Sequence, residues 1–99
     1  SQPLFRQTTD IELVEACKRQ SRKAQQQLYE RFSGRMLGIC MRYLKDRMEA
    51  EDILVGGFLK VFDKIGQYEG SGSFEGWLRR VFVNECLMFL RRQNRLTIP

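Results

Sequence analysis

Hydrophobic residues recur every three or four positions along most of the chain, a spacing typical of amphipathic helices. The first helix predicted by this pattern is short and begins after Thr9 or Asp10, either of which can cap it. The second is long, is capped by Ser21, and carries an apolar face that ends at Tyr43. We therefore expect one short and one long helix in the first half of the chain.

Two further helices are expected in the second half. Asp46 and Glu49 have the spacing of a capping box, which predicts that the third helix begins near Arg47. Gly66 is placed to stop this helix, and residues 67–73 then form a glycine-rich loop. Ser71 or Ser73 caps the fourth helix, which is expected to run to about residue 92 or 95. The predicted fold class is all-α, a compact bundle of about four helices with a flexible loop before the last.

Two glycines lie inside the second predicted helix and two inside the third. Gly34 and Gly38 either weaken the second helix or let another helix approach it closely. Gly56 and Gly57 lie in the third helix, where each is expected to cost about 1 kcal/mol relative to alanine. The third helix should therefore be locally weakened, by too little to unfold it.

A chain of 99 residues predicts a single domain. We expect a disordered lead-in at residues 1–9, the helical domain at 10–95 and the start of a linker at 96–99. The three cysteines, Cys17, Cys40 and Cys86, are widely spaced on apolar stripes, which predicts buried free thiols in a reducing compartment. No apolar run is long enough to span a membrane, and we expect a cytoplasmic protein.

The formal charge of +5 favours a polyanionic partner. Six basic side chains balance six acidic ones in residues 34–72, whereas residues 73–99 hold five arginines against two glutamates. A second basic cluster lies at residues 18–23. The positive field is therefore expected mainly on the fourth helix.

An enzymatic role is disfavoured. The sequence has no histidine and no closely spaced cysteine pair, and its carboxylates cluster where a helix N-terminus explains them. The loop at 69–73 follows a helix and lacks the Gly-Lys-Ser/Thr ending of a phosphate-binding loop. We therefore expect no catalytic residue, no metal ligand set and no cofactor.

Arg80, Asn84 and Arg91 are four and then seven residues apart, so they share one stripe of the otherwise apolar fourth helix. One interpretation is a solvated helix face, with Trp77 in the core. The other is a surface of arginines and an amide that follows phosphates and reads a base, beside an aromatic-flanked loop. Spacing alone does not decide between them.

Two segments resemble a known family. "AEDILVGGFLKVFDKI" at Ala50–Ile65 and "SFEGWLRRVFVNECLMFLRR" at Ser73–Arg92 are similar to the second conserved region of bacterial sigma factors of the extracytoplasmic-function group. The resemblance extends from about Asp10 to Arg92. It implies a transcription initiation domain that binds core RNA polymerase and the non-template strand of the minus-ten promoter element, with an anti-sigma factor as a further partner.

The resemblance also implies site residues. The helix at 47–65 would dock on the clamp coiled coil of the polymerase beta-prime subunit, and the loop with the fourth helix would capture the melted strand. The implied polymerase contacts are Asp52, Val55, Gly56 and Leu59. The implied DNA contacts are Gln67, Tyr68, Glu69, Gly70, Ser71, Gly72, Ser73, Phe74, Arg79, Arg80, Asn84, Arg91 and Arg92.

This chain departs from the family pattern at the docking helix. Val55-Gly56 stands where the family usually has Gln-Glu, and Met88 stands where an acidic residue is common. We therefore predict weakened polymerase docking with intact strand recognition. The alternatives are a non-catalytic helical adaptor that lies on a membrane surface and a general single-stranded nucleic-acid binding domain.

Overall fold

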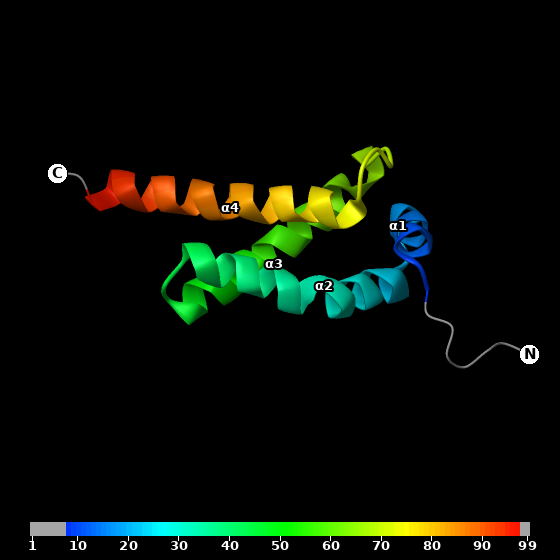
Figure 1. The fold of residues 1–99 in the computed structure, drawn as a ribbon, viewed down its shortest axis with the longest axis horizontal. Coiled ribbons are helices and arrows are strands. Elements are labelled where there is room, and N and C mark those ends of the chain that lie inside the picture. Colours follow the sequence, from blue (N-terminus) through cyan, green and yellow to red (C-terminus); the bar gives the residue numbers. More distant parts are fainter. Residues whose placement is uncertain (1–7, 98–99) are drawn as a thin grey trace, which may run out of the picture.

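The computed structural model describes residues 8–97, which contain four α-helices, one turn of 3₁₀ helix and no strand (Figure 1). The elements are α1 (Asp10–Lys18), α2 (Arg22–Tyr43), α3 (Arg47–Lys64), η1 (Ile65–Gln67) and α4 (Phe74–Thr97). The predicted all-α class is confirmed. The predicted lead-in falls mainly on residues outside the described range, as do residues 98–99 of the predicted linker. The α4 helix runs two residues past its latest predicted end.

The first two helices begin at the predicted caps. Thr9 and not Asp10 caps α1: Thr9 Oγ1 accepts from the backbone N–H of Glu12 at 3.2 Å, and the backbone N–H of Thr9 donates to Glu12 Oε1 at 2.8 Å. Ser21 Oγ accepts from the backbone N–H of Ala24 at 3.2 Å and caps α2. Both side chains satisfy donors that the helix itself leaves unpaired.

Asp46 caps α3 as predicted, but the expected capping box is wrong. Asp46 Oδ1 accepts from the backbone N–H of Met48 at 2.8 Å. The Glu49 carboxylate accepts instead from Gln93 Nε2 at 3.1 Å. This hydrogen bond joins the beginning of α3 to the last turns of α4, and a tertiary contact has therefore replaced the local one.

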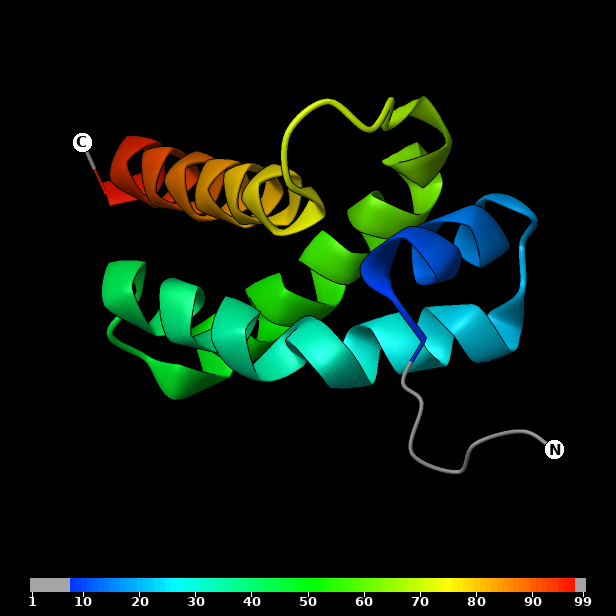
Figure 2. The same ribbon diagram turned by 45° about the vertical axis from the view of Figure 1, so that its right-hand side comes forward.

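The loop that precedes α4 needs glycine at two positions. Gly70 and Gly72 have φ angles of 86° and 79°, in the left-handed region that other residues rarely adopt. Gly66 does not stop α3 in this way: α3 ends at Lys64 and tightens into η1, which contains Gly66. The chain therefore turns towards α4 through η1 and the residues that follow it (Figure 2).

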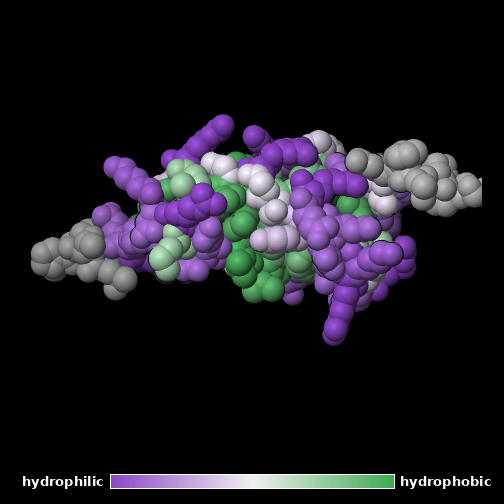
Figure 3. Space-filling view, turned by 90° about the horizontal axis from the view of Figure 1, so that it is seen from below, coloured by the Kyte–Doolittle hydropathy of each residue, from purple (hydrophilic) through white to green (hydrophobic). Residues whose placement is uncertain are grey.

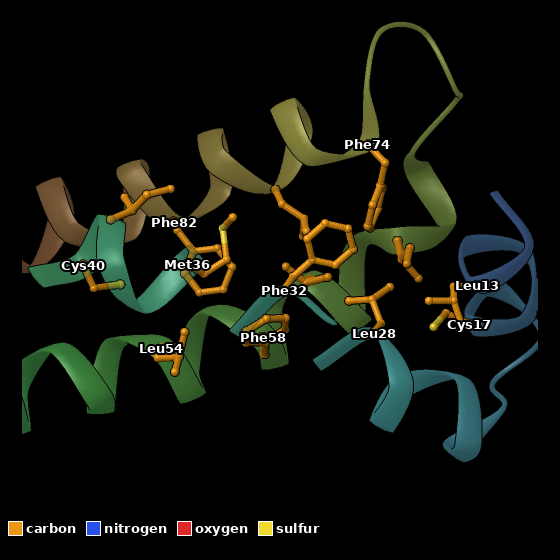
Figure 4. Packing of buried hydrophobic residues seen from close by; sticks show 14 of the residues in the cluster. Leu13, Cys17, Leu28, Phe32, Met36, Cys40, Leu54, Phe58, Phe74 and Phe82 are labelled. Carbon is orange, nitrogen blue, oxygen red and sulfur yellow. The ribbon is translucent and has the colours of Figure 1, made fainter. Parts of the chain in front are cut away.

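The core lies between α2, α3 and α4, with α1 packed on α2 and η1 (Figures 1 and 4). Phe58 of α3 packs edge-to-face on Phe82 of α4 with ring centroids 5.0 Å apart. Phe32 of α2 packs in the same way on Phe74 at 5.8 Å. No polar or charged side chain of the described residues is buried. Hydrophobic burial therefore holds the bundle together.

The predicted burial of the thiols is confirmed, since Cys17, Cys40 and Cys86 are all buried and free. The structure also decides between the two readings of the α2 glycines. A Cβ atom added to Gly34 or Gly38 would meet no other group within 4 Å. Neither glycine therefore permits a close helix approach, and both simply lower the helical propensity of α2.

Candidate nucleic-acid interface

The acidic side chains of α4 pair with other helices of the bundle, whereas its arginines face solvent. Glu75 pairs with Arg35 of α2, and Glu85 pairs with Lys60 of α3 at 3.0 Å. The arginines of α4 are exposed, and none forms an ion pair with the described residues; they are Arg79, Arg80, Arg91, Arg92 and Arg95. The helix therefore presents unneutralised positive charge to solvent, which is the electrostatic requirement for binding a polyanion.

The structure brings three of the predicted α4 residues together and separates two. Arg80, Asn84 and Arg91 lie on one exposed stripe, opposite the side that buries Leu78 and Phe82. Arg79 and Arg92 are each one residue, or about 100° around the helix, away from a member of this stripe. A strand bound along the stripe therefore does not automatically reach all of the predicted arginines.

Asn84 has an amide that is available for recognition. Its side chain is exposed and forms no hydrogen bond with the described residues. It neither caps α4 nor ties it to another helix. An amide offers both a donor and an acceptor, which suits the edge of a base better than a phosphate.

A hollow of about 380 Å³ lies beside the loop, between it and α1. Glu69, Gly70 and Gly72 line it from the loop, and Ile11 and Lys18 line it from α1. Lys18 Nζ also donates to the backbone carbonyl of Tyr68 at 2.9 Å, so α1 and the first loop residue are joined directly. Sequence reasoning missed this wall of the hollow, although Lys18 belongs to the second basic cluster, because nothing in the spacing pairs it with residue 68.

The loop is also anchored at its end next to α4. Tyr68 Oη donates to the carbonyl of Gly72 at 3.0 Å, and Ser73 Oγ accepts from the backbone N–H of Gly76 at 2.8 Å. Ser73 and not Ser71 is therefore the cap of α4. The Tyr68 ring packs against Phe74 and Trp77, with centroid distances of 5.3 and 5.5 Å. These contacts fix the position of the loop over α4.

Phe74 and Trp77 belong to the core side of this site. Phe74 is 6% exposed and points inward (Figure 4), and Trp77 is half-buried and stacks on it at 5.7 Å. Phe74 stands among the predicted DNA contacts, but its burial suits it to support the loop. Tyr68 is half-buried, and the other predicted loop residues, Gln67, Glu69 and Ser71 among them, are exposed.

The predicted docking residues share the outer face of α3. Asp52, Val55 and Leu59 are exposed, Val55 by 55% and Leu59 by 66%, while Gly56 is half-buried. Figure 3, which views the molecule from the side of α2 and α3, shows hydrophobic surface flanked by strongly polar surface. Exposed aliphatic side chains on a helix face are the usual material of a protein interface.

The cysteines give no sign of catalytic chemistry. Burial, together with the neighbouring Cys86 thiol, raises the pKa of Cys40 to about 12, so the reactive thiolate is suppressed. Burial also raises the pKa of Cys86 and of Cys17. Within residues 8–97, no cluster of three or more potential ligands could hold a metal ion. No helix in the same range is long and apolar enough to cross a membrane.

Comparison with known proteins gives one consistent result. Residues 28–96 match the family described as Sigma-70 region 2. The chain is 30% identical over 92 residues to the RNA polymerase sigma-H factor of Pseudomonas aeruginosa, and 32% identical over 89 residues to the ECF RNA polymerase sigma-E factor of Haemophilus influenzae. These alignments cover 93% and 90% of this chain but 48% and 47% of the two relatives. The chain therefore spans about half the length of the curated relatives it matches.

A solved structure also resembles this one closely. It is an NMR structure of an engineered region 2 of sigmaE in complex with GTAAAA. The two folds superpose with a TM-score of 0.88 and share 25% sequence identity. The match covers 97% of this chain and all of the other. The arrangement of helices is therefore that of a domain that binds this oligonucleotide in the solved complex.

Proposed function

This chain belongs to the Sigma-70 region 2 family, and from that premise we propose that it captures the non-template strand of a minus-ten promoter element for RNA polymerase. The observation that carries the proposal is the stripe of Arg80, Asn84 and Arg91 on α4, which is exposed and forms no ion pair with the described residues. The loop hollow lies at the beginning of the same helix, where Phe74 lines it. The similar solved domain in complex with GTAAAA supports it. The role is that of a binding protein in transcription initiation, in the cytoplasm with the polymerase.

In this proposal the stripe on α4 and the hollow beside the loop would bind different parts of the strand. The arginines of the stripe would follow the phosphates, since guanidinium groups bind phosphate oxygens through paired hydrogen bonds. Asn84 would read the edge of one base with its amide, the pairing that suits adenine. The hollow between α1 and the loop would receive a base turned out of the stack, with the backbone at Gly70 and Gly72 open to it.

The outer face of α3 would bind the clamp coiled coil of the beta-prime subunit. Asp52, Val55, Gly56 and Leu59 form the centre of this proposed surface. With Val55 and Gly56 in place of a Gln-Glu pair, the contact would rest on aliphatic packing more than on hydrogen bonds. An anti-sigma factor is a further proposed partner, and it would have to cover one of these two surfaces in order to compete with polymerase or DNA.

The proposal is tested with the 99-residue chain and labelled single strands. Fluorescence anisotropy with GTAAAA, with each single-base variant and with a scrambled hexamer should show at least tenfold preference for one sequence. The same sequence as RNA and anionic vesicles serve as comparators. Equal affinity for every sequence would indicate a general nucleic-acid binding domain, and binding to vesicles alone would indicate a membrane-surface adaptor.

A further inference from the structure

A second hollow lies between α4 and the C-terminal end of α2, and Figure 1 shows these two helices one above the other. Its volume is about 410 Å³, and it is lined by Ile39, Arg42 and Tyr43 of α2 and by Arg79 and Val83 of α4. This hollow shares no residue with the one beside the loop. Arg79, which does not belong to the exposed stripe of Arg80, Asn84 and Arg91, lines this second hollow.

The second hollow is strongly positive. Arg42 and Arg79 are both exposed, neither forms an ion pair with the described residues, and no carboxylate lines the hollow. An anion bound between these two guanidinium groups would offset their mutual repulsion. A phosphate group with several acceptor oxygens suits this position.

The same hollow also has an aromatic wall. Tyr43 is 39% exposed, and its side chain makes no ring contact or hydrogen bond within the described residues. Ile39 and Val83 supply aliphatic surface beside it. An available aromatic face next to unpaired arginines is the combination on which single-stranded nucleic acids are held, by stacking of the base and pairing of the phosphate.

We propose that this hollow binds one nucleotide of the strand that the loop and the α4 stripe engage, with Tyr43 stacked on the base and Arg42 and Arg79 on the phosphate. The inference rests on the proposed function and extends its binding site. Along α4, Phe74 and Val83 are nine residues apart, a rise of about 14 Å. The strand must therefore continue several nucleotides beyond those at the loop to reach the second hollow.

The test compares a hexamer with a 14-mer that extends the same sequence at both ends. The variants Arg42→Ala and Tyr43→Leu change the second hollow without touching the loop or the stripe. Lys45→Ala is the matched control, because Lys45 is exposed, lies two residues from Tyr43, forms no ion pair with the described residues and does not line the hollow. Melting curves confirm that each variant folds, as expected for exposed side chains.

The wild-type chain should bind the 14-mer more tightly than the hexamer. Tyr43→Leu should lower affinity for the 14-mer at least fivefold, roughly the loss of one base stack, and Tyr43→Phe should restore it. Arg42→Ala should make the slope of log affinity against log salt shallower by about 0.7, the value of one phosphate contact on a single strand. Hexamer affinity should be unchanged in all three variants.

A spectroscopic readout separates stacking from charge. With 2-aminopurine placed in turn at each outer position of the 14-mer, one position should lose fluorescence on binding, and this loss should vanish in Tyr43→Leu alone. The inference is overturned if Arg42→Ala and Tyr43→Leu have the same affinity for the 14-mer as Lys45→Ala, provided that the wild-type chain still binds the hexamer. If the wild-type chain binds neither the hexamer nor the 14-mer, the proposed function is overturned as well.

Discussion

A Cβ atom added to Gly57 would lie 2.2 Å from Cε1 and 2.7 Å from Cδ1 of Phe82. The buried ring of Phe82 on α4 thus occupies the space that a side chain on α3 would take. The same ring packs on Phe58, one residue further along α3. Gly57 is therefore a packing position, in addition to the helical propensity that it is expected to cost α3.

Gly56→Ala and Gly57→Ala form a matched pair of substitutions with opposite expected effects. A Cβ at Gly56 meets nothing within 4 Å, so alanine there should raise the free energy of unfolding by about 0.8–1 kcal/mol through helical propensity. At Gly57 the same gain is opposed by overpacking against Phe82, which typically costs about 1–3 kcal/mol, so the variant should be less stable. Urea unfolding measures both, and equal stabilisation would show that the Phe82 ring moves aside freely.

Asn84→Ala should weaken binding in a sequence-dependent way. Loss of an amide that contacts a base is expected to cost about 1–3 kcal/mol with the preferred oligonucleotide and little with a scrambled one. The melting temperature should not change, because the amide is exposed and makes no hydrogen bond with the described residues. Anisotropy titrations with both strands provide the measurement. Equal losses on the two would assign Asn84 to a backbone contact.

Val55→Gln combined with Gly56→Glu should strengthen polymerase docking. Each restored polar contact is worth about 0.5–1.5 kcal/mol, and more when charged. The open space at Gly56 accommodates the new side chain, which should also raise the melting temperature modestly. Calorimetric titration with a fragment of the beta-prime clamp coiled coil measures the binding. Gly56→Ala is the control that stabilises α3 without adding a polar group, and unchanged or weaker clamp binding in the double variant would remove this face as the docking site.

The Cys40 thiol should make stability fall at alkaline pH. Its pKa is about 12 in the folded protein against an ordinary value of 9.0, so the unfolded chain loses the proton first. The stabilisation is complete below about pH 9 and is lost as the pH rises towards 12. Cys40→Ala, which leaves a cavity, should be less stable than the wild type at pH 7.5, and the gap should narrow by pH 10.5. Parallel pH profiles in urea unfolding with reductant would refute this role.

The helices and all four of their N-terminal caps lay among the predicted residues, because both depend on neighbours in sequence. A serine or threonine hydroxyl reaches a backbone N–H three residues ahead, as Ser21 and Ser73 do, whatever surrounds it. The capping box at Glu49 failed for the opposite reason, since Gln93 competes for that carboxylate from another helix. The packing role of Gly57 was equally invisible, because it depends on a residue 25 positions away.

The candidate site likewise contains features that local sequence predicts and features that depend on contacts between distant helices. Periodicity alone places Arg80, Asn84 and Arg91 on one face, and the structure shows that face exposed. Neither the α1 wall of the loop hollow nor the meeting of Arg42 with Arg79 leaves any trace in local spacing. Both arise where helices that are distant in sequence are brought together by burial of their apolar faces.

The hydrogen bond from Tyr68 to Gly72 changes what the glycines of the loop mean. It closes the chain into a small ring, and the tether from Lys18 holds the start of that ring against α1. Ordering a free backbone costs about 1–2 kcal/mol of conformational entropy per residue, which a ligand must otherwise overcome when it binds. Here part of that ordering is completed during folding. The glycines therefore serve to reach left-handed conformations in a receptor that is already shaped before its ligand arrives.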